Sequence, residues 1–292
     1  MPSRRSFPSI LVLMLALLTF LSFALAGCSS SKPTATPANV KDLTVHYIDV
    51  GQADSILIQT PAGQAVLVDG GNRDDGPSVV KYLKSQGISR LDAIIATHPH
   101  EDHIGGLPDV LKQIPVNTVY LPKATHTSKT YEDLLNAIKA SGAQRVQAKG
   151  GVNLNLNGVE AKMLAPNSDS YEELNDYSAV LKLTYGNTSF LLMGDAEALS
   201  ESEILKKGYD VRADVLKLGH HGSSSSTSDA FLKAVSPKYA IISCGKDNSY
   251  GHPHRETMAK LTKAKIGVYR TDQQGTVVAR SDGKTINMTT SQ

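Results

Sequence analysis

Residues 97–106 read THPHEDHIGG, and this stretch decides how the rest of the chain is interpreted. It follows the apolar run Leu91–Ala96, which predicts a buried strand. Four side chains of the stretch can bind a metal ion: His98, His100, Asp102 and His103. Imidazole nitrogens and carboxylate oxygens suit zinc, manganese or iron, so the cluster predicts a metal site at the end of the strand. The alternative is a polar turn at a helix N-terminus, with Asp102 as the cap.

Two further apolar runs end in residues of the same kind. Phe190–Met193 leads into Gly194-Asp195, and Val215–Leu218 leads into Gly219-His220-His221-Gly222. In α/β sheets, ligands bind at the carboxyl ends of the strands, so the three strand ends predict one shared site. Asp195 is the candidate for a carboxylate that bridges two cations, although a Gly-Asp pair alone is more often a simple turn.

The chain from about Asp42 onward alternates short apolar runs with helical patterns and has no internal repeat or linker. This alternation predicts an α/β protein with one two-sheet domain over residues 42–292. Further strands are expected at 43–50, 55–60, 65–68, 116–121, 159–164, 179–185, 189–193, 239–243, 267–271, 276–281 and 285–289. Helices are expected at 77–86, 131–140, 197–207, 228–235 and 255–265.

The combination of motifs resembles the metallo-β-lactamase family. The chain looks more narrowly like the hydrolase domain of ComEC-type DNA-uptake proteins, and the resemblance covers roughly residues 42–290. The matching segments are 49–54 (DVGQAD), 69–71 (DGG), 194–195 (GD), 217–223 (KLGHHGS) and 248–254 (NSYGHPH). The resemblance implies an α/β fold of four layers, an αββα sandwich. It also implies two divalent metal ions, Zn²⁺ or Mn²⁺, at one edge.

The resemblance also assigns roles to individual residues. The implied metal ligands are His98, His100, Asp102, His103 and Asp195, with His220 and His221 as the candidates for a later ligand. Asp102 is expected to act in catalysis, by orienting the nucleophile or accepting its proton. Further residues are expected near the metal or in contact with substrate: Asp69, Asp49, Asp54, Ser178, His252 and His254.

The chain departs from the broader family pattern in one respect. The family usually supplies another histidine between the cluster and the bridging aspartate, but here the interval holds only His126, in a loop-like segment. The ComEC-type pattern has a polar segment there, similar to residues 175–178 (NDYS). The tandem His220-His221 would compensate, as in the phosphocholine esterases of bacterial surfaces, which the chain also resembles.

The first residues are typical of an export signal. Arg4 and Arg5 precede an apolar run over residues 10–26, which ends in Leu-Ala-Gly-Cys28. This ending resembles a bacterial lipobox, so residues 1–27 are expected to be a lipoprotein signal peptide and Cys28 the lipidated residue. Residues 28–41 would be a flexible tether, and the lipid would anchor the domain to the outer face of the cell membrane. An uncleaved membrane anchor is the alternative.

Composition weighs on the choice of substrate. Outside the first 27 residues, 28 basic and 28 acidic residues balance, and aromatic residues make up only 5% of the chain. The balanced charge disfavours a nucleic-acid binder that is basic over its whole surface. With so few aromatic residues, the sequence shows no obvious platforms on which bases could stack. The leading hypothesis is a surface phosphodiesterase, a nuclease acting on external DNA. The alternatives are a phosphocholine or teichoic-acid esterase, and a non-catalytic DNA-uptake accessory lipoprotein. No channel helix is expected after residue 26.

Overall fold

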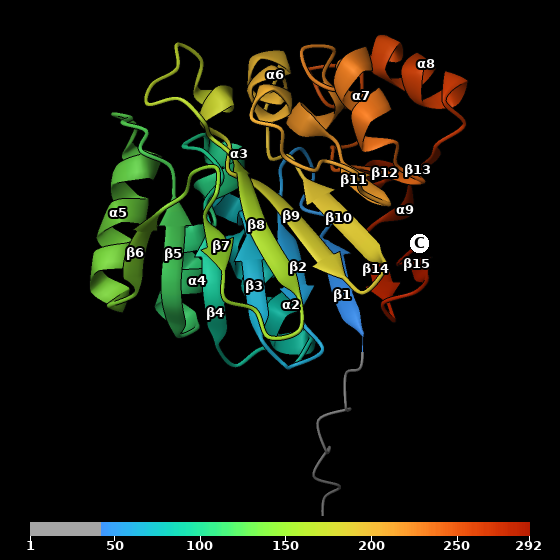
Figure 1. Ribbon diagram of the computed structural model, residues 1–292. Coiled ribbons are helices and arrows are strands. Elements are labelled where there is room, and N and C mark those ends of the chain that lie inside the picture. The colour runs from blue at the N-terminus through green and yellow to red at the C-terminus, as the bar shows by residue number, and fades with distance from the viewer. Residues whose placement is uncertain (1–41) are drawn as a thin grey trace, which may run out of the picture. The chain divides into compact units, whose positions relative to one another are not determined.

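The computed structural model describes residues 42–292, which form two mixed β-sheets packed face to face with helices on both outer sides (Figure 1). The eight-stranded sheet has the order β15-β14-β1-β2-β3-β4-β5-β6, and the seven-stranded sheet has the order β13-β12-β11-β10-β9-β8-β7. This arrangement confirms the predicted αββα sandwich.

The strands of the first sheet are β1 (Leu43–Tyr47), β2 (Ile56–Gln59), β3 (Ala65–Val68), β4 (Leu91–Ile95), β5 (Val116–Leu121), β6 (Gln144–Gln147), β14 (Val277–Ser281) and β15 (Ile286–Thr290). Those of the second are β7 (Asn153–Leu154), β8 (Glu160–Ala165), β9 (Val180–Tyr185), β10 (Thr188–Leu192), β11 (Val215–Lys217), β12 (Tyr239–Ile242) and β13 (Gly267–Arg270). The α-helices are α2 (Gly76–Ser85), α3 (Glu101–Ile104), α4 (Leu107–Gln113), α5 (Lys129–Ser141), α6 (Ala198–Lys206), α7 (Asp229–Val235), α8 (Arg255–Lys263) and α9 (Thr271–Gln274).

Strands that are apolar on both faces hold the layers together. In β4, Ala93 and Ile95 pack between the two sheets, whereas the intervening Ile94 packs under the helices α2, α4 and α5. Because successive side chains point to opposite faces, one short apolar run serves both layers. A third apolar cluster lies between the second sheet and the helices α6, α7 and α8.

The same topology positions the site. In the first sheet β4 runs parallel to β3 and β5, and in the second β11 runs parallel to β10 and β12. The loops that follow β4, β10 and β11 therefore leave the sandwich at one edge. This agrees with the prediction that the residues after these three strands form one shared site.

Some expectations need correction in detail. The helix α3, which includes Asp102 and His103 of the cluster, was not predicted, and neither were α4 and the short strands β6 and β7. The expected signal peptide, the tether and Cys28 lie outside the described residues. Within residues 42–292, no helix is long and apolar enough to span a membrane.

Candidate metal centre

Asp195 lies at the centre of the site, in the loop after β10, with only 2% of its surface exposed. Its Oδ1 is 3.2 Å from Nε2 of His103. Its Oδ2 is 3.6 Å from Nε2 of His221 and 3.9 Å from Nε2 of both His98 and His220. One buried carboxylate thus faces four imidazoles that come from two different loops.

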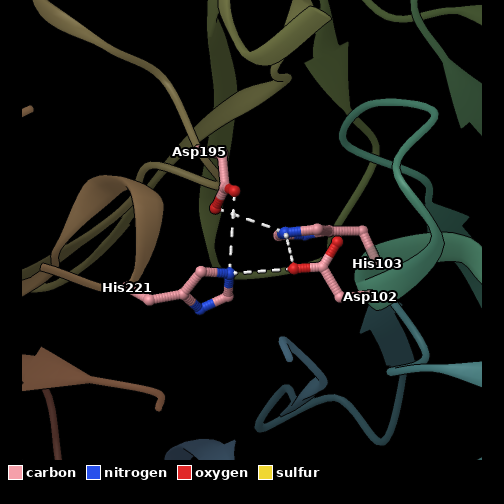
Figure 2. A group of neighbouring side chains, drawn as sticks. All are labelled: Asp102, His103, Asp195 and His221. Atoms are coloured by element: carbon pink, nitrogen blue, oxygen red, sulfur yellow. Dashed lines mark hydrogen bonds and ion pairs between the residues drawn. The ribbon is translucent and has the colours of Figure 1, made fainter. Parts of the chain in front are cut away.

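Asp102 completes one side of this arrangement, which Figure 2 shows. Its Oδ2 lies 3.2 Å from Nε2 of His221 and 3.7 Å from Nε2 of His103. The possible ligand atoms of Asp102, His103, Asp195 and His221 all lie within 4.8 Å of one another. On the other side, Nε2 of His98 is 3.0 Å from Nδ1 of His100.

Each of three histidines uses its Nδ1 to bind the protein. Nδ1 of His103 donates to Asp69 Oδ2 at 2.7 Å, and Nδ1 of His221 donates to the carbonyl of Ser243 at 2.9 Å. Nδ1 of His220 donates to Glu197 Oε1 at 2.8 Å. The Nε2 atoms are thereby left to face Asp195, as in histidines that bind metal ions.

The donor set fits a metal ion. Nε2 of His103 and Oδ1 of Asp195 are fully buried and have no hydrogen-bond partner of good geometry among the described residues. Buried polar atoms of this kind carry a desolvation cost unless a partner compensates it. A divalent cation supplies that compensation, and imidazole with carboxylate is a donor set that zinc and manganese accept.

The charges of the cluster depend on one another. Burial alone would lower the pKa of His103, but the carboxylates of Asp195, Asp102 and Asp69 outweigh burial and hold that pKa well above its usual value. Burial would raise the pKa of Asp195, but the positive charges of His103 and His221 hold it well below the usual value. Burial lowers the pKa of His98 well below the ordinary value. Without a metal ion, His103 therefore carries the proton.

Asp69 is a positioning residue for the cluster. Besides His103, it accepts hydrogen bonds from the backbone N–H of Thr97 at 2.8 Å and from Thr97 Oγ1 at 2.7 Å. The second sheet supplies a similar support. The backbone N–H of Asp195 donates to Ser178 Oγ at 3.0 Å, and the same oxygen lies 3.4 Å from Nδ1 of His98. Gly194 has φ +54°, and a Cβ there would lie 3.1 Å from Thr97, so glycine permits this close approach.

Asp54 lies beside His221. It forms an ion pair with the fully buried Lys217, with 2.8 Å between Nζ and Oδ2, and its Oδ1 lies 3.6 Å from Nδ1 of His221. Nζ of Lys217 also donates to the carbonyl of Leu218 at 2.8 Å. A charged pair in this position sets the electrostatic surroundings of His221.

Comparison with known proteins agrees with this geometry. Residues 48–246 match the model of the metallo-beta-lactamase superfamily. The chain belongs to that superfamily. It is 35% identical over 253 residues to ComE operon protein 3 of Bacillus subtilis, covering 81% of this chain and 33% of that protein. It is 33% identical to competence protein ComA of Neisseria gonorrhoeae, covering 86% of this chain and 34% of that protein. The chain thus spans about a third of the length of these relatives.

Solved structures show the same fold. The metallo-beta-lactamase fold protein YhfI of Bacillus subtilis superposes with a TM-score of 0.50 at 14% identity, over 78% of this chain and 96% of that one. The metallo-β-lactamase fold binds divalent metals, and this chain carries a His/Asp cluster where the loops after β4, β10 and β11 meet. The chain is a metallo-β-lactamase superfamily hydrolase with competence-protein relatives.

Two residues that were predicted near the metal or substrate, Asp49 and His254, do not contact the His/Asp cluster. Asp49 is exposed, and its Oδ1 accepts the backbone N–H of Gly51 at 3.2 Å, so it stabilises a turn instead. Nδ1 of His254 accepts the backbone N–H of Ser224 at 2.9 Å. Neither side chain contacts a ligand candidate, although the ring of His254 lies 4.8 Å from that of His252, and a role of either residue towards substrate stays a prediction. The loop residue His126 also lies apart, with Nδ1 2.8 Å from Ser128 Oγ.

His252 lines the opening of the site together with residues that were not predicted, Gln52 and Tyr250 among them, whereas the unpredicted Glu197 contacts His220. A cleft of about 450 Å³ lies over the cluster, and its lining includes His252, Gln52 and Tyr250 together with the ligand candidates. The residues predicted for the site did not include Glu197, Gln52 or Tyr250. Glu197 is the first residue of the predicted helix 197–207, where nothing in the sequence marks it as a site residue. Gln52 and Tyr250 lie inside the motifs 49–54 and 248–254, which were the available signal for them.

Proposed function

We propose that the protein is a two-metal phosphodiesterase that acts as a nuclease at the bacterial cell surface. The observation that carries this proposal is the position of Asp195, a single buried carboxylate between two groups of imidazoles. A carboxylate in that position can bridge two cations, and pairs of cations are a common solution for hydrolysis of phosphate esters.

The candidate ligands would fall into two groups, one for each metal ion. One ion would be held by Asp102, His103 and His221, and the other by His98, His100 and His220, with Asp195 shared between them. His220 would take the place of the histidine that the broader family has and this chain lacks. Zn²⁺ and Mn²⁺ both suit these donors.

The residues around the ions have separate tasks. When bound, the ions would neutralise charge on the phosphate and help a water molecule to ionise near neutral pH. Asp102 is the carboxylate of the cluster with a partly exposed side chain, at 31%, and can orient that water. Burial would raise the pKa of Asp102, but His103 and His221 outweigh burial and hold that pKa well below its usual value, so the carboxylate stays ionised for this task. Burial, with the neighbouring His221, lowers the pKa of His252 to about 4. Its neutral ring is therefore suited to donate a hydrogen bond to a phosphate oxygen.

The relatives support a nucleic acid as the substrate. Their names refer to the ComE operon and to competence, and a third is named recombination protein 2, from Haemophilus influenzae. The surface location rests on the expected lipidation of Cys28. Replacing Cys28 by serine should move the protein from the membrane fraction to the soluble fraction. An unchanged distribution would contradict the lipid anchor.

The activity is tested with bis(p-nitrophenyl) phosphate and metal-free protein resupplied with Mn²⁺ or Zn²⁺, beside a His100→Ala control. Hydrolysis that requires the metal and disappears in the variant is expected, and plasmid or single-stranded DNA should then be cut. Turnover of p-nitrophenylphosphorylcholine without cleavage of DNA would instead favour the phosphocholine esterase. DNA binding without any hydrolysis would favour the accessory lipoprotein.

A further inference from the structure

Three aromatic rings lead from the metal centre to the surface. The rings of His221 and His252 are nearly parallel, at 24°, with 6.1 Å between centroids. The ring of Tyr250 continues the series, at 17° and 5.6 Å from His252. The inner ring is buried among the ligand candidates, whereas Tyr250 is 67% exposed.

An exposed tyrosine at this place is unusual for the molecule. Within residues 42–292, Tyr250 and Leu199 are the large hydrophobic side chains left exposed. Tyr250 also lines the cleft that contains His100, Asp102 and Asp195. Exposing the ring of Tyr250 leaves apolar surface in contact with water. The ring lies beside the groups of the site, where it can contact a ligand.

The loop that carries Tyr250 is held in place by side chains. Asn248 Nδ2 donates to the carbonyls of Gly245 and His252, at 2.9 and 2.6 Å, and Asn248 Oδ1 accepts the backbone N–H of His252 at 3.0 Å. Nε2 of His254 donates to the carbonyl of Tyr250 at 3.2 Å. The ring of Tyr250 is thus presented on a braced loop, which lowers the entropy lost when a ligand stacks on it.

We propose that Tyr250 is the platform on which a nucleobase next to the scissile phosphate stacks, as a fourth ring in the series that begins at His221. The inference deepens the proposed function and rests on it for the identity of the phosphate. Aromatic stacking contributes to binding of single strands whatever the base, and a cleft of about 450 Å³ lies within the size range of small-molecule sites.

The surroundings favour a base over a quaternary ammonium group. Choline-type cations are held in cages of several aromatic faces. Tyr250 has one face against His252 and is 67% exposed, so it offers one open face to the cleft. The lining of the cleft also includes Gln52 and Asn72, whose amides bind Gly245 and Asp75 and keep further hydrogen-bonding capacity for base edges. One open ring beside amides suits a flat, polar-edged heterocycle.

The test compares two octamers with the same phosphates, oligodeoxythymidylate and a strand of abasic tetrahydrofuran residues. Binding of the fluorescein-labelled strands to the purified full-length protein is measured by anisotropy in a His100→Ala background, alone and combined with Tyr250→Ala, Tyr250→Phe or Leu199→Ala. Hydrolysis of both octamers is measured with the same changes in the otherwise native protein.

We expect Tyr250→Ala to weaken binding of oligodeoxythymidylate about tenfold and to raise its KM with little change in kcat. Tyr250→Phe, which keeps the ring, and Leu199→Ala, which removes the other exposed apolar side chain, should stay within twofold of the parent. The abasic octamer should bind weakly and equally to all variants.

Equal affinity of the parent for the two octamers would overturn the proposal, and so would an unchanged affinity in Tyr250→Ala. Tyr250-dependent binding of p-nitrophenylphosphorylcholine, without such binding of the octamer, would overturn it in favour of a choline site. If hydrolysis persists but Tyr250→Ala changes neither affinity nor KM, the stacking proposal fails and the proposed phosphodiesterase activity is retained. Tyr250-dependent octamer binding without hydrolysis under any metal would remove the nuclease and keep the platform.

Discussion

The imidazole of His220 lies between two carboxylates. Its Nδ1 donates to Glu197 Oε1 at 2.8 Å, and its Nε2 lies 3.9 Å from Asp195 Oδ2. Glu197 is itself held by Ser225 Oγ at 2.9 Å and by Asn175 Nδ2 at 3.1 Å. A carboxylate that accepts a hydrogen bond from Nδ1 of a histidine fixes the orientation of the ring and makes Nε2 a better metal ligand.

Glu197→Gln should therefore weaken binding of the metal ion assigned to His220 by about 10- to 100-fold, and the second ion of the proposed pair should stay tightly bound. Calorimetric titration of the metal-free protein with Zn²⁺ or Mn²⁺ measures both steps. Glu203→Gln is the matched control, since Glu203 lies in α6, the helix that directly follows Glu197, but contacts Ser168 and Tyr171. Equal weakening of both ions, or none, would show that Glu197 does not position a ligand.

Metal binding should release protons from the Asp102 side of the site. The pKa of His103 is held well above its usual value, and the pKa of His221 is also raised, because nearby carboxylates outweigh the effect of burial. An ion must displace these protons, so its affinity should rise with pH, about tenfold per pH unit for each proton released. Burial keeps His98 neutral, so the other ion should depend less on pH. Titrations in buffers of different ionisation enthalpy count the protons, and a pH-independent affinity between about pH 6 and 8 would contradict the assignment.

The buried pair of Lys217 and Asp54 should be costly to break on one side only. Lys217→Met leaves the carboxylate of Asp54 buried without its cation, which should lower the free energy of unfolding by about 3–5 kcal/mol. The double variant Lys217→Met/Asp54→Asn should recover part of this loss, because no unpaired charge remains. Urea unfolding with a chelator present measures both. If the double variant is as unstable as the single one, the loss comes from packing and not from charge.

His46 should make the fold sensitive to acid at a point away from the metal centre. It is buried in β1, with Nδ1 2.9 Å from Tyr82 Oη and Nε2 2.8 Å from Gln59 Oε1, and burial lowers its pKa to about 4. The unfolded chain binds the proton near pH 6.5, so the contribution of His46 is complete above that pH. It is lost as the pH falls towards 4, by up to about 3 kcal/mol.

His46→Gln removes this term. The difference in unfolding free energy between the native protein and the variant should therefore shrink between pH 6.5 and 4, as followed by urea unfolding in the presence of a chelator. Parallel stability curves for the two proteins over that range would disprove the role of His46.

Much of the architecture could be predicted from local patterns. The apolar runs Leu91–Ala96 and Tyr239–Ser243 are strands because they are apolar on both faces, which suits a strand covered by helices on one side and by a sheet on the other. The helix Leu107–Gln113 and the edge strand Gln144–Gln147 escaped prediction. The helix is short, is preceded by Gly105-Gly106 and has a proline in its first turn, so its sequence is typical of a loop. The edge strand is polar and exposed along most of its length, so it lacks the apolar pattern of a strand.

The amino-acid sequence by itself determined the family and the residues that could bind a metal, because histidines and aspartates at fixed spacings after buried strands form a local signal. Only the tertiary structure decided how they divide. Both His220 and His221 face Asp195, but the fold places Nε2 of His221 beside Asp102 and Nδ1 of His220 beside Glu197, although the two histidines are adjacent in the chain. It also left Asp49 at an exposed turn and brought Tyr250 to the cleft. The reason is physical: distance and burial depend on how separate loops pack at one edge of two sheets, and no spacing along the chain encodes that packing.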